Sequence, residues 1–243
     1  MTKRRVVISQ SMYFPWVGML EQIRLADVFI HYDDVQFTRR GFSHRIKVKI
    51  PDGTSWLSVP LREHTRGPAI DEVRIIPVSD WADRHLALLD TSLHRAPFAK
   101  EAREIMVSVL SGKHETVRDV ARESMLALCR YFGLDTTTEF VDSRDLCIGG
   151  SGSDRILSLV KTVGGTDYVT GHGALNYLDH ASFEANRISV SYMDYQCLPY
   201  PQLHGEFTPY VTALDLVANC GREGLANIAS GTQNWKEFAN GTS

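Results

Sequence analysis

Only four cysteines occur among the 243 residues, and they lie far apart, at Cys129, Cys147, Cys197 and Cys220. None of them forms a Cys-x-x-Cys pair, and no histidine stands at zinc-ligand spacing from any of them. A chain of this length is stabilised by burial of its core, so it does not need a disulfide framework. The scarcity of cysteine therefore argues against a structural zinc site and a disulfide-stapled domain, and it indicates reduced thiols.

Long apolar runs and an excess of basic charge are also absent. No segment approaches the roughly 18 apolar residues of a membrane span. The apolar stretch near the N-terminus is shorter than the roughly 7–15 residues that a signal peptide needs. The 26 Lys and Arg residues against 29 Asp and Glu residues give a formal net charge of -3, whereas a dedicated nucleic-acid-binding domain is usually basic. We therefore expect a cytoplasmic globular protein, in which a local basic patch is still compatible with the composition.

Short apolar strands alternate with helical stripes along most of the chain. Residues 5–9, 17–25 and 28–31 have the patterns of a strand, a helix and a strand, which together form a βαβ unit with parallel strands. Residues 45–59 alternate polar and apolar side chains around Pro51-Asp52-Gly53, which predicts a β-hairpin. Later strands are expected at 73–76, 139–141, 168–170 and 188–192, and later helices at 153–163, 174–183 and 212–219.

The segment 79–133 shows helical periodicity throughout and ends at Gly133, a residue typical of helix C-termini. We therefore expect an α/β protein with a mostly parallel sheet, flanking helices, a β-hairpin insertion and a helical subdomain. The predicted parts are an N-terminal α/β part with a basic hairpin (1–78), a helical subdomain (79–133) and a C-terminal α/β part (134–243) that forms one composite domain with the first. The last ten residues or so are expected to be frayed.

Polar and aromatic side chains follow the first predicted strand. Gln10, Tyr13 and Trp16 lie between that strand and the first helix. In parallel α/β proteins, ligands gather outside the carboxyl ends of strands and near helix N-termini. These three residues are therefore candidates for ligand contact. The alternative is a packing turn in which both aromatic rings are buried.

Two adjacent carboxylates, Asp33 and Asp34, follow the second strand, with Gln36 close behind. Neighbouring side chains of an extended segment point to opposite sides, so one carboxylate can face a site while the other caps or pairs with an arginine. The one that faces the site would serve as a general base, a Mg²⁺ ligand or the partner of a substrate amine. The alternative is a pair of solvated loop charges.

A basic stretch precedes and includes the first strand of the hairpin. Its residues are Arg39, Arg40, His44, Arg45, Lys47 and Lys49. Residues 45, 47 and 49 share one face of a strand, and Arg and Lys side chains suit phosphate or carboxylate groups. Such a cluster in an acidic protein indicates an anionic ligand, for example a nucleotide-sugar, a phosphopantetheine carrier or an RNA end. The alternative is an edge strand that its charges protect from aggregation.

A glycine-rich turn, Gly171-His172-Gly173, follows the strand predicted at 168–170. Such a turn before a helical segment is typical of a phosphate-binding loop, although it matches neither the Walker pattern nor the dinucleotide fingerprint. The glycines leave His172 accessible, and it is the histidine best placed for acid–base catalysis. The alternative is an incidental surface histidine.

Several short sequence blocks of the chain also occur, in the same order, in one protein family. The blocks are Ile8–Gly18, Ala26–Ile30, Asp33–Phe37, Arg45–Lys49 before Pro51-Asp52-Gly53, Trp56–Pro60, Gly171 with Tyr177–Asp179, Tyr200–Gln202, Phe207–Pro209 and Leu214-Asp215. In this order they resemble the WbqC-like family, over a range from about residue 6 to residue 221. The family often has proline where this chain has Ser11 and asparagine where it has His44.

The resemblance implies a transferase. Such proteins are similar to ones encoded in gene clusters for O-antigen and other surface polysaccharides, and clusters for specialised metabolites are a second setting. Transfer of an acyl or aminoacyl group, such as glycyl, onto an amino group of a sugar or specialised metabolite is the expected reaction. The expected partner is an anionic small molecule that carries phosphate or carboxylate, with a carrier protein or an aminoacyl-tRNA as candidate donor. The resemblance leaves the cofactor unknown, and no residue is assigned as a metal ligand.

Asp33, Asp34 and His172 are the candidate catalytic residues. The residues expected to bind substrate are Gln10, Tyr13, Trp16, Gln36, Arg45, Lys47, Gly171, Tyr177, Asp179, Gln202 and Asp215. One alternative function is a nucleotide-dependent, adenylyl-transferring enzyme, although the His-x-Gly-His signature is missing. Another is a non-catalytic binding module for a carrier protein or a nucleic acid.

Overall fold

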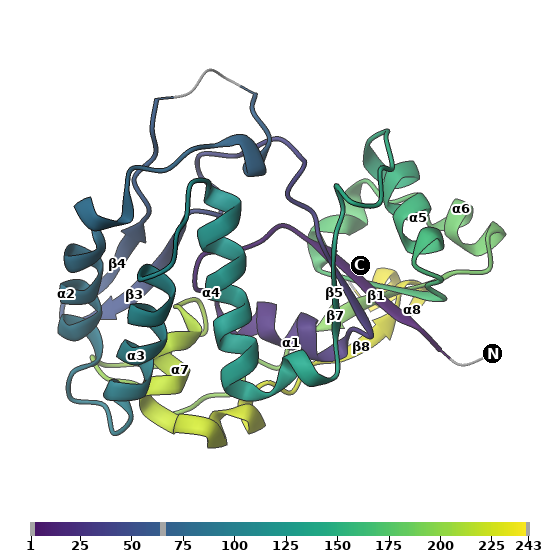
Figure 1. The fold of residues 1–243 in the computed structure, drawn as a ribbon. Helices are drawn as coiled ribbons and strands as arrows, with labels where there is room; N and C mark the ends of the chain where they lie inside the picture. Colours follow the sequence, from purple (N-terminus) through teal and green to yellow (C-terminus); the bar gives the residue numbers. More distant parts are fainter. Residues whose placement is uncertain (1–2, 64–66, 242–243) are drawn as a thin grey trace.

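A six-stranded sheet organises the computed structural model, which describes residues 3–63 and 67–241 (Figure 1). In their spatial order the strands are β5 (Glu139–Asp142), β2 (Val28–His31), β1 (Arg5–Ser9), β6 (Asp167–Thr170), β7 (Ser189–Asp194) and β8 (Gly231–Asn234). The first five are parallel, and β8 is antiparallel to β7. The expected α/β class with a mostly parallel sheet is therefore confirmed.

Alternate strand residues enter two separate cores. Val7, Phe29 and Val169 face one core, and Val6, Ile8 and Tyr168 face the other. The first core is closed by α1 (Val17–Leu25), α4 (Val117–Phe132) and α7 (Ala213–Cys220), and the second by α5 (Gly152–Thr162), α6 (His180–Ala185) and α8 (Trp235–Gly241). Because helices cover both faces, the inner strands have nearly continuous apolar sequences instead of alternating ones.

The hairpin forms its own two-stranded sheet, β3 (Arg45–Ile50) and β4 (Gly53–Ser58). Its inner side chains, Ile46, Val48 and Leu57, belong to the first core. The helices α2 (Ala82–Leu93) and α3 (Ala99–Leu110) lie with the hairpin and α7 on the side of the molecule away from α5 and α6 (Figure 1). The β-hairpin and the helical segment are therefore confirmed as elements, whereas the domain boundaries at 78 and 133 stay a prediction.

Two local predictions were wrong. Residues 73–76 form only isolated bridges, Ile75 with Leu61 and Arg74 with Thr116, and no strand. The last ten residues were expected to be frayed, but those up to residue 241 are ordered. Strand β8 pairs with β7, and α8 packs Trp235 and Phe238 against the second core. Strand β8 reads Gly-Thr-Gln-Asn and has no apolar pattern that could have revealed it.

Strand β1 is the point at which the strand order reverses. Its neighbours are β2 on one side and β6 on the other. The chain leaves β1 for β2 through α1, and it returns to β6 through α5, which lies on the opposite face of the sheet. The connections at the carboxyl ends of β1 and β6 therefore diverge, and open α/β sheets bind their ligands in the crevice that such a divergence creates.

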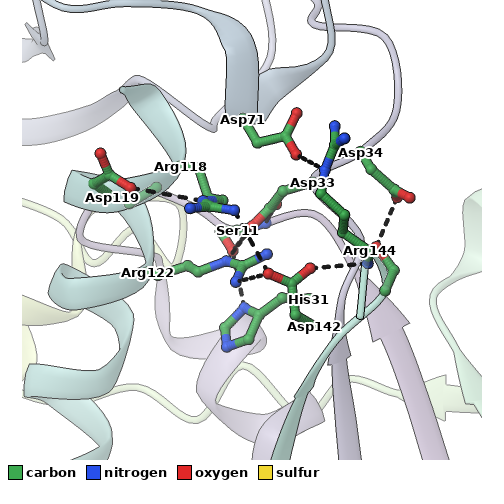
Figure 2. Close-up of polar contacts among 12 residues, drawn as sticks. Ser11, His31, Asp33, Asp34, Asp71, Arg118, Asp119, Arg122, Asp142 and Arg144 are labelled. Carbon is green, nitrogen blue, oxygen red and sulfur yellow. Dashed lines mark hydrogen bonds and ion pairs between the residues drawn. The ribbon is translucent and has the colours of Figure 1, made fainter. Parts of the chain in front are cut away.

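A chain of ion pairs attaches α4 to the carboxyl ends of β2 and β5 (Figure 2). Arg122 Nε lies 2.6 Å from Asp33 Oδ2, and Arg122 Nη1 lies 2.5 Å from Asp142 Oδ2. Asp33 is fully buried and also accepts hydrogen bonds from the backbone N–H and the hydroxyl of Ser11. The α4 helix itself begins at a capping box of Thr116 and Asp119 and ends at Gly133, whose φ is +74°.

We predict that replacement of Arg122 by leucine lowers the free energy of unfolding by about 3–5 kcal/mol, because it leaves the buried carboxyl group of Asp33 without its cationic partner. Arg118→Leu is the matched control on the same helix. Its guanidinium lies 3.6 Å from both Asp119 and Asp142 and is one-third exposed, so we expect a loss of at most about 1 kcal/mol. Urea unfolding measures both values, and equal losses would contradict this account of the network.

Candidate functional site

Two adjoining cavities open at the carboxyl ends of β1, β2 and β6, where the strand order reverses. Their volumes are about 520 and 440 Å3. They share four lining residues, Gln10, Tyr32, Ile156 and Tyr177, and we refer to the two together as the switch-point cleft. The cleft therefore lies where an open α/β sheet is expected to bind a ligand.

Five of the sequence-predicted residues line this cleft. They are Gln10, Asp34, Gln36, Gly171 and Tyr177. They come from the ends of β1, β2 and β6, and the topology brings these ends to one edge of the sheet. Separate stretches of the chain, around residues 10, 34 and 171, thus line one cleft, whereas the side chains of Tyr13 and His172 do not line it.

Neutral hydrogen-bonding groups dominate the cleft. Tyr32, Tyr168 and Tyr177 line it, and burial raises the pKa of each phenol, so these groups stay protonated at neutral pH. Two amides, Gln10 and Gln22, add further donors. Phenols and amides can donate to an oxyanion without carrying a negative charge of their own, so the cleft suits an anionic ligand.

Asp34 is the one carboxylate among the residues that line the cleft, and it is paired with Arg155 of α5. Its other oxygen accepts a hydrogen bond of 2.6 Å from Ser143 Oγ. The Arg155 side chain is also fixed, because its Nε donates to the carbonyl of Ile148 at 2.9 Å and its guanidinium lies over the Tyr32 ring. Asp34 is therefore held in place at the wall of the cleft.

The turn before α5 contributes backbone to the same wall, and sequence reasoning missed it. Gly150 and Gly152 have positive φ angles of +92° and +58°, and together with Ser151 they line the cleft. The signal was present in the sequence, because Gly149-Gly150-Ser151-Gly152 is a glycine-rich turn between a strand and a helix. Arg155, in the first turn of that helix, was also missed, because its partner Asp34 lies 121 residues earlier in the chain.

Asp33 points away from the cleft, toward α4, so the two adjacent carboxylates face opposite sides of the chain as expected. Ser11 Oγ donates to Asp33 Oδ2 at 2.7 Å and lies 2.9 Å from His31 Nδ1. Burial lowers the pKa of His31 to about 3, so its imidazole is neutral, and burial raises the pKa of Asp33. This group resembles a serine–histidine pair, but Ser11 is fully buried and no substrate can reach its hydroxyl.

Tyr13 and Trp16 are placed by packing. Tyr13 is fully buried, and its hydroxyl lies 2.9 Å from His85 Nδ1. Trp16 is half-buried and precedes α1, and its ring lies against those of Tyr195 and Tyr210. An added Cβ at Gly18 would lie 2.2 Å from the Trp16 ring, so the glycine of the Trp-Val-Gly block makes room for the indole.

His172 and Asp179 lie beside the cleft and do not line it. The His172 side chain is exposed, its Nε2 lies 2.7 Å from the carbonyl oxygen of Met193, and its ring contacts those of Tyr195 and Phe238. Asp179 caps α6, where it accepts hydrogen bonds from the backbone N–H and the hydroxyl of Ser182. Catalysis by His172 and substrate binding by Asp179 stay predictions.

The other four predicted residues lie on or near the hairpin. Arg45 and Lys47 are on its outer face, and both cations lie over the Trp56 ring. Asp215 and Lys49 are buried, and Lys49 Nζ donates a hydrogen bond of 3.2 Å to Oε1 of the half-buried Gln202. None of these side chains lines the switch-point cleft.

The described residues contain no group of three or more His, Cys, Asp and Glu side chains arranged to hold a metal ion. Among the helices in the described ranges, none is both long and apolar enough to cross a membrane.

Comparison with known proteins gives a family and one relative. The family model described as the WbqC-like protein family matches residues 10–227. The chain is 32% identical over 222 residues to a protein of Mycobacterium tuberculosis (strain ATCC 25618 / H37Rv) named "Uncharacterized protein Rv1507c", and the match covers 90% of this chain and 95% of the relative. No solved structure matches the chain. The matched range contains all the blocks on which the sequence resemblance rests, apart from Ile8 and Ser9 at the start of the first block.

The buried Asp215 predicts a pH-dependent stability. Burial raises its pKa to about 6 from an ordinary 3.8, although hydrogen bonds from Tyr200, Gln202 and Asn219 and the charge of Lys49 act in the opposite direction. The folded chain therefore binds this proton more tightly than the unfolded chain, and the stability that it contributes is present below pH 4 and is lost as the pH rises through 6.

We expect the unfolding free energy of Asp215→Asn, relative to that of the parent protein, to increase by up to about 3 kcal/mol between pH 4 and pH 7, at about 1.4 kcal/mol per pKa unit. Urea titrations of both proteins at the two pH values measure this difference. A difference that does not change with pH would contradict the raised pKa.

Proposed function

The chain belongs to the WbqC-like protein family, and on that premise we propose that it is a transferase that moves an acyl or aminoacyl group onto an amine of a small anionic metabolite. The observation that carries the proposal is the composition of the switch-point cleft. Neutral donors surround it, and one carboxylate, Asp34, is fixed at its wall by Arg155 and Ser143. A phosphate- or carboxylate-bearing sugar or specialised metabolite with an amino group fits this set of contacts.

The donors would recognise the anionic part of the acceptor. Gln10, Tyr32 and Tyr177 line both halves of the cleft and can donate to phosphate or carboxylate oxygens. Arg155 supplies positive charge at the same wall, and the backbone of residues 150–152 lies beside it at the start of α5, where helix N–H groups favour an anion.

Asp34 would act on the amine. The amine nitrogen attacks the acyl carbonyl carbon, a C–N bond forms, and the bond from that carbon to the donor's leaving group breaks. The proton that the nitrogen loses passes to Asp34, which acts as a general base, and from there to the leaving group. Backbone N–H groups in the turn at residues 171–173, which borders the cleft, would stabilise the oxyanion that develops on the carbonyl.

A second candidate function, adenylyl transfer, is favoured by the strand order. The order β5-β2-β1-β6-β7 with a ligand cleft between β1 and β6 is the arrangement that nucleotide-binding α/β proteins use. The turn after β1, however, has neither the dinucleotide fingerprint nor a His-x-Gly-His signature. Release of pyrophosphate from ATP would support this function, and transfer from a preactivated donor without ATP would support the first.

We predict that Asp34→Asn lowers kcat/KM for transfer by roughly 10²–10⁴-fold, since that is the usual contribution of a general base. The assay incubates the protein with thioester, aminoacyl-adenylate and aminoacyl-RNA donors and a panel of amino sugars and their phosphates, and detects the amide product by mass spectrometry. Asp154→Asn is the control, because this exposed carboxylate lies on α5 beside Arg155 but outside the cleft.

Parent-like transfer by Asp34→Asn would exclude Asp34 as the base while leaving the transferase assignment intact. Absence of transfer by the parent protein from every donor class would exclude the assignment itself.

A further inference from the structure

The outer face of the hairpin exposes aromatic rings among cations. Register places Lys47 opposite Trp56, and Arg45 and Lys47 lie on the same face as that indole. The Arg45 guanidinium carbon lies 4.2 Å from the centre of the Trp56 ring, and Lys47 Nζ lies 5.4 Å from it. Phe42 extends the surface, with its ring centre 6.1 Å from that of Trp56. We call these four residues the hairpin face.

The charge of this surface is positive, in contrast to that of the whole chain. The segment from residue 38 to residue 50 holds five Lys and Arg residues and no Asp or Glu, whereas the net charge of the chain is -3. Four of the five point outward or are part-exposed, namely Arg39, Arg40, Arg45 and Lys47, and the fifth, Lys49, is buried against Gln202. Arg84 of α2 adds a further cation beside Trp56, at a small cavity of about 170 Å3.

Protection of an edge strand explains the cations but not the rings. Lysine and arginine alone keep an edge strand from pairing with another chain, and exposed aromatic rings work against that purpose. Trp56 is 40% exposed and Phe42 44% exposed, on a protein that has ample core in which to bury them. A positively charged surface with exposed aromatic rings is instead the arrangement that holds single-stranded nucleic acid, because the cations contact the phosphates and the rings stack on bases.

Two chain segments connect the hairpin face with the switch-point cleft. Gln36 lines the cleft, and Phe42 of the hairpin face follows six residues later, so their Cα atoms are at most about 22 Å apart. Met12 also lines the cleft, and the backbone N–H of the next residue, Tyr13, donates to the carbonyl of Phe42 at 3.2 Å. A strand that lies on the hairpin face can therefore direct its end toward the cleft.

We propose that the hairpin face binds the single-stranded end of an RNA. The proposal rests on the proposed function and deepens it, because it assigns the donor as an acyl or aminoacyl ester on the terminal ribose of that RNA. In the transfer, the ester C–O bond breaks and the C–N bond of the amide forms. The proton that the amine loses ends on the ribose oxygen, so the products are the amide and an RNA with a free hydroxyl. No further co-reactant is required.

The test measures binding directly and does not depend on activity. The probe is a fluorescein-labelled single-stranded RNA of about 12 nucleotides, a length within the usual site sizes, and its anisotropy is followed with the full chain. We expect Trp56→Ala to weaken binding roughly 5- to 100-fold, since it removes a stacking surface, and Trp56→Phe to retain most of the affinity. Base stacking should also quench tryptophan fluorescence in the parent protein and not in Trp56→Phe.

Charge is tested separately from stacking. Lys47→Gln should reduce the dependence of log affinity on log salt concentration by about 0.7, the value for one phosphate contact on a single strand. Lys100→Gln is the matched control, because Lys100 is a highly exposed lysine on α3 that is not part of the hairpin face, and it should leave the slope unchanged. Circular dichroism and thermal unfolding identify any variant that fails to fold.

Three results would overturn the proposal. One is parent-like binding by folded Trp56→Ala, and a second is equal binding of a duplex of the same sequence, since paired bases cannot stack on the rings. The third is a polyglutamate peptide that binds as tightly as the RNA and depends on Lys47 but not on Trp56, which would mark the surface as a dock for an acidic carrier protein.

Failure of the RNA proposal and failure of the proposed function are distinguishable. RNA binding that persists in Asp34→Asn, with no transfer by the parent, would support the surface and reject the transferase. Transfer from thioester donors without RNA binding would support the transferase and reject the RNA-binding surface.

Discussion

Two carboxylates, Asp33 and Asp34, follow β2. Each needs a cationic partner in order to be buried, because an unpaired buried charge is strongly destabilising. Asp33 takes Arg122 from α4, and Asp34 takes Arg155 from α5. These helices cover opposite faces of the sheet. The pleat that sends adjacent side chains to opposite sides of the strand thus fixes one helix on each face to the same point of the rim. The wall of the switch-point cleft that Asp34, Arg155 and Tyr32 form is positioned relative to that point.

The two ion pairs have different surroundings, and this difference separates scaffold from site. Asp33 is enclosed by Ser11 and Arg122 and has no exposed surface, while Asp34 lies at the wall of an open cavity. A charge that is fully enclosed fixes geometry but cannot exchange a proton with a bound molecule. A charge at a cavity wall can do both, which is why the chemistry is assigned to Asp34 even though the two residues are neighbours in the sequence.

Local patterns in the sequence were sufficient for the five parallel strands of the sheet and for the turn residues Gln10 and Asp34 at its rim. Residues 5–9 and 28–31 are apolar runs with polar residues at their ends, and that pattern places Gln10 and Asp34 at the carboxyl ends of parallel strands. The pattern does not contain the partners, because Arg122 and Arg155 lie on helices about 90 and 120 residues away from the carboxylates that they pair with. Ion pairs between distant elements leave no periodicity to detect. Strand β8 was missed for a related reason, since pairing with β7 and not its own composition makes it a strand.

The contrast between local patterns and contacts of distant elements also explains why the predicted site residues separate into two groups. Residues at strand ends converge because parallel topology forces them to one edge, whereas Gln202 and Asp215 join Lys49 only because the loop after β7 folds over one end of the hairpin. That loop covers Lys49 and leaves Arg45 and Lys47 outside, so the period-two face recognised in the sequence is divided into a buried cation and two accessible ones. The buried one is satisfied by protein oxygens and holds the loop. The accessible ones remain available to a partner, and residues 36–42 join Gln36, which lines the cleft, to Phe42 of the hairpin face.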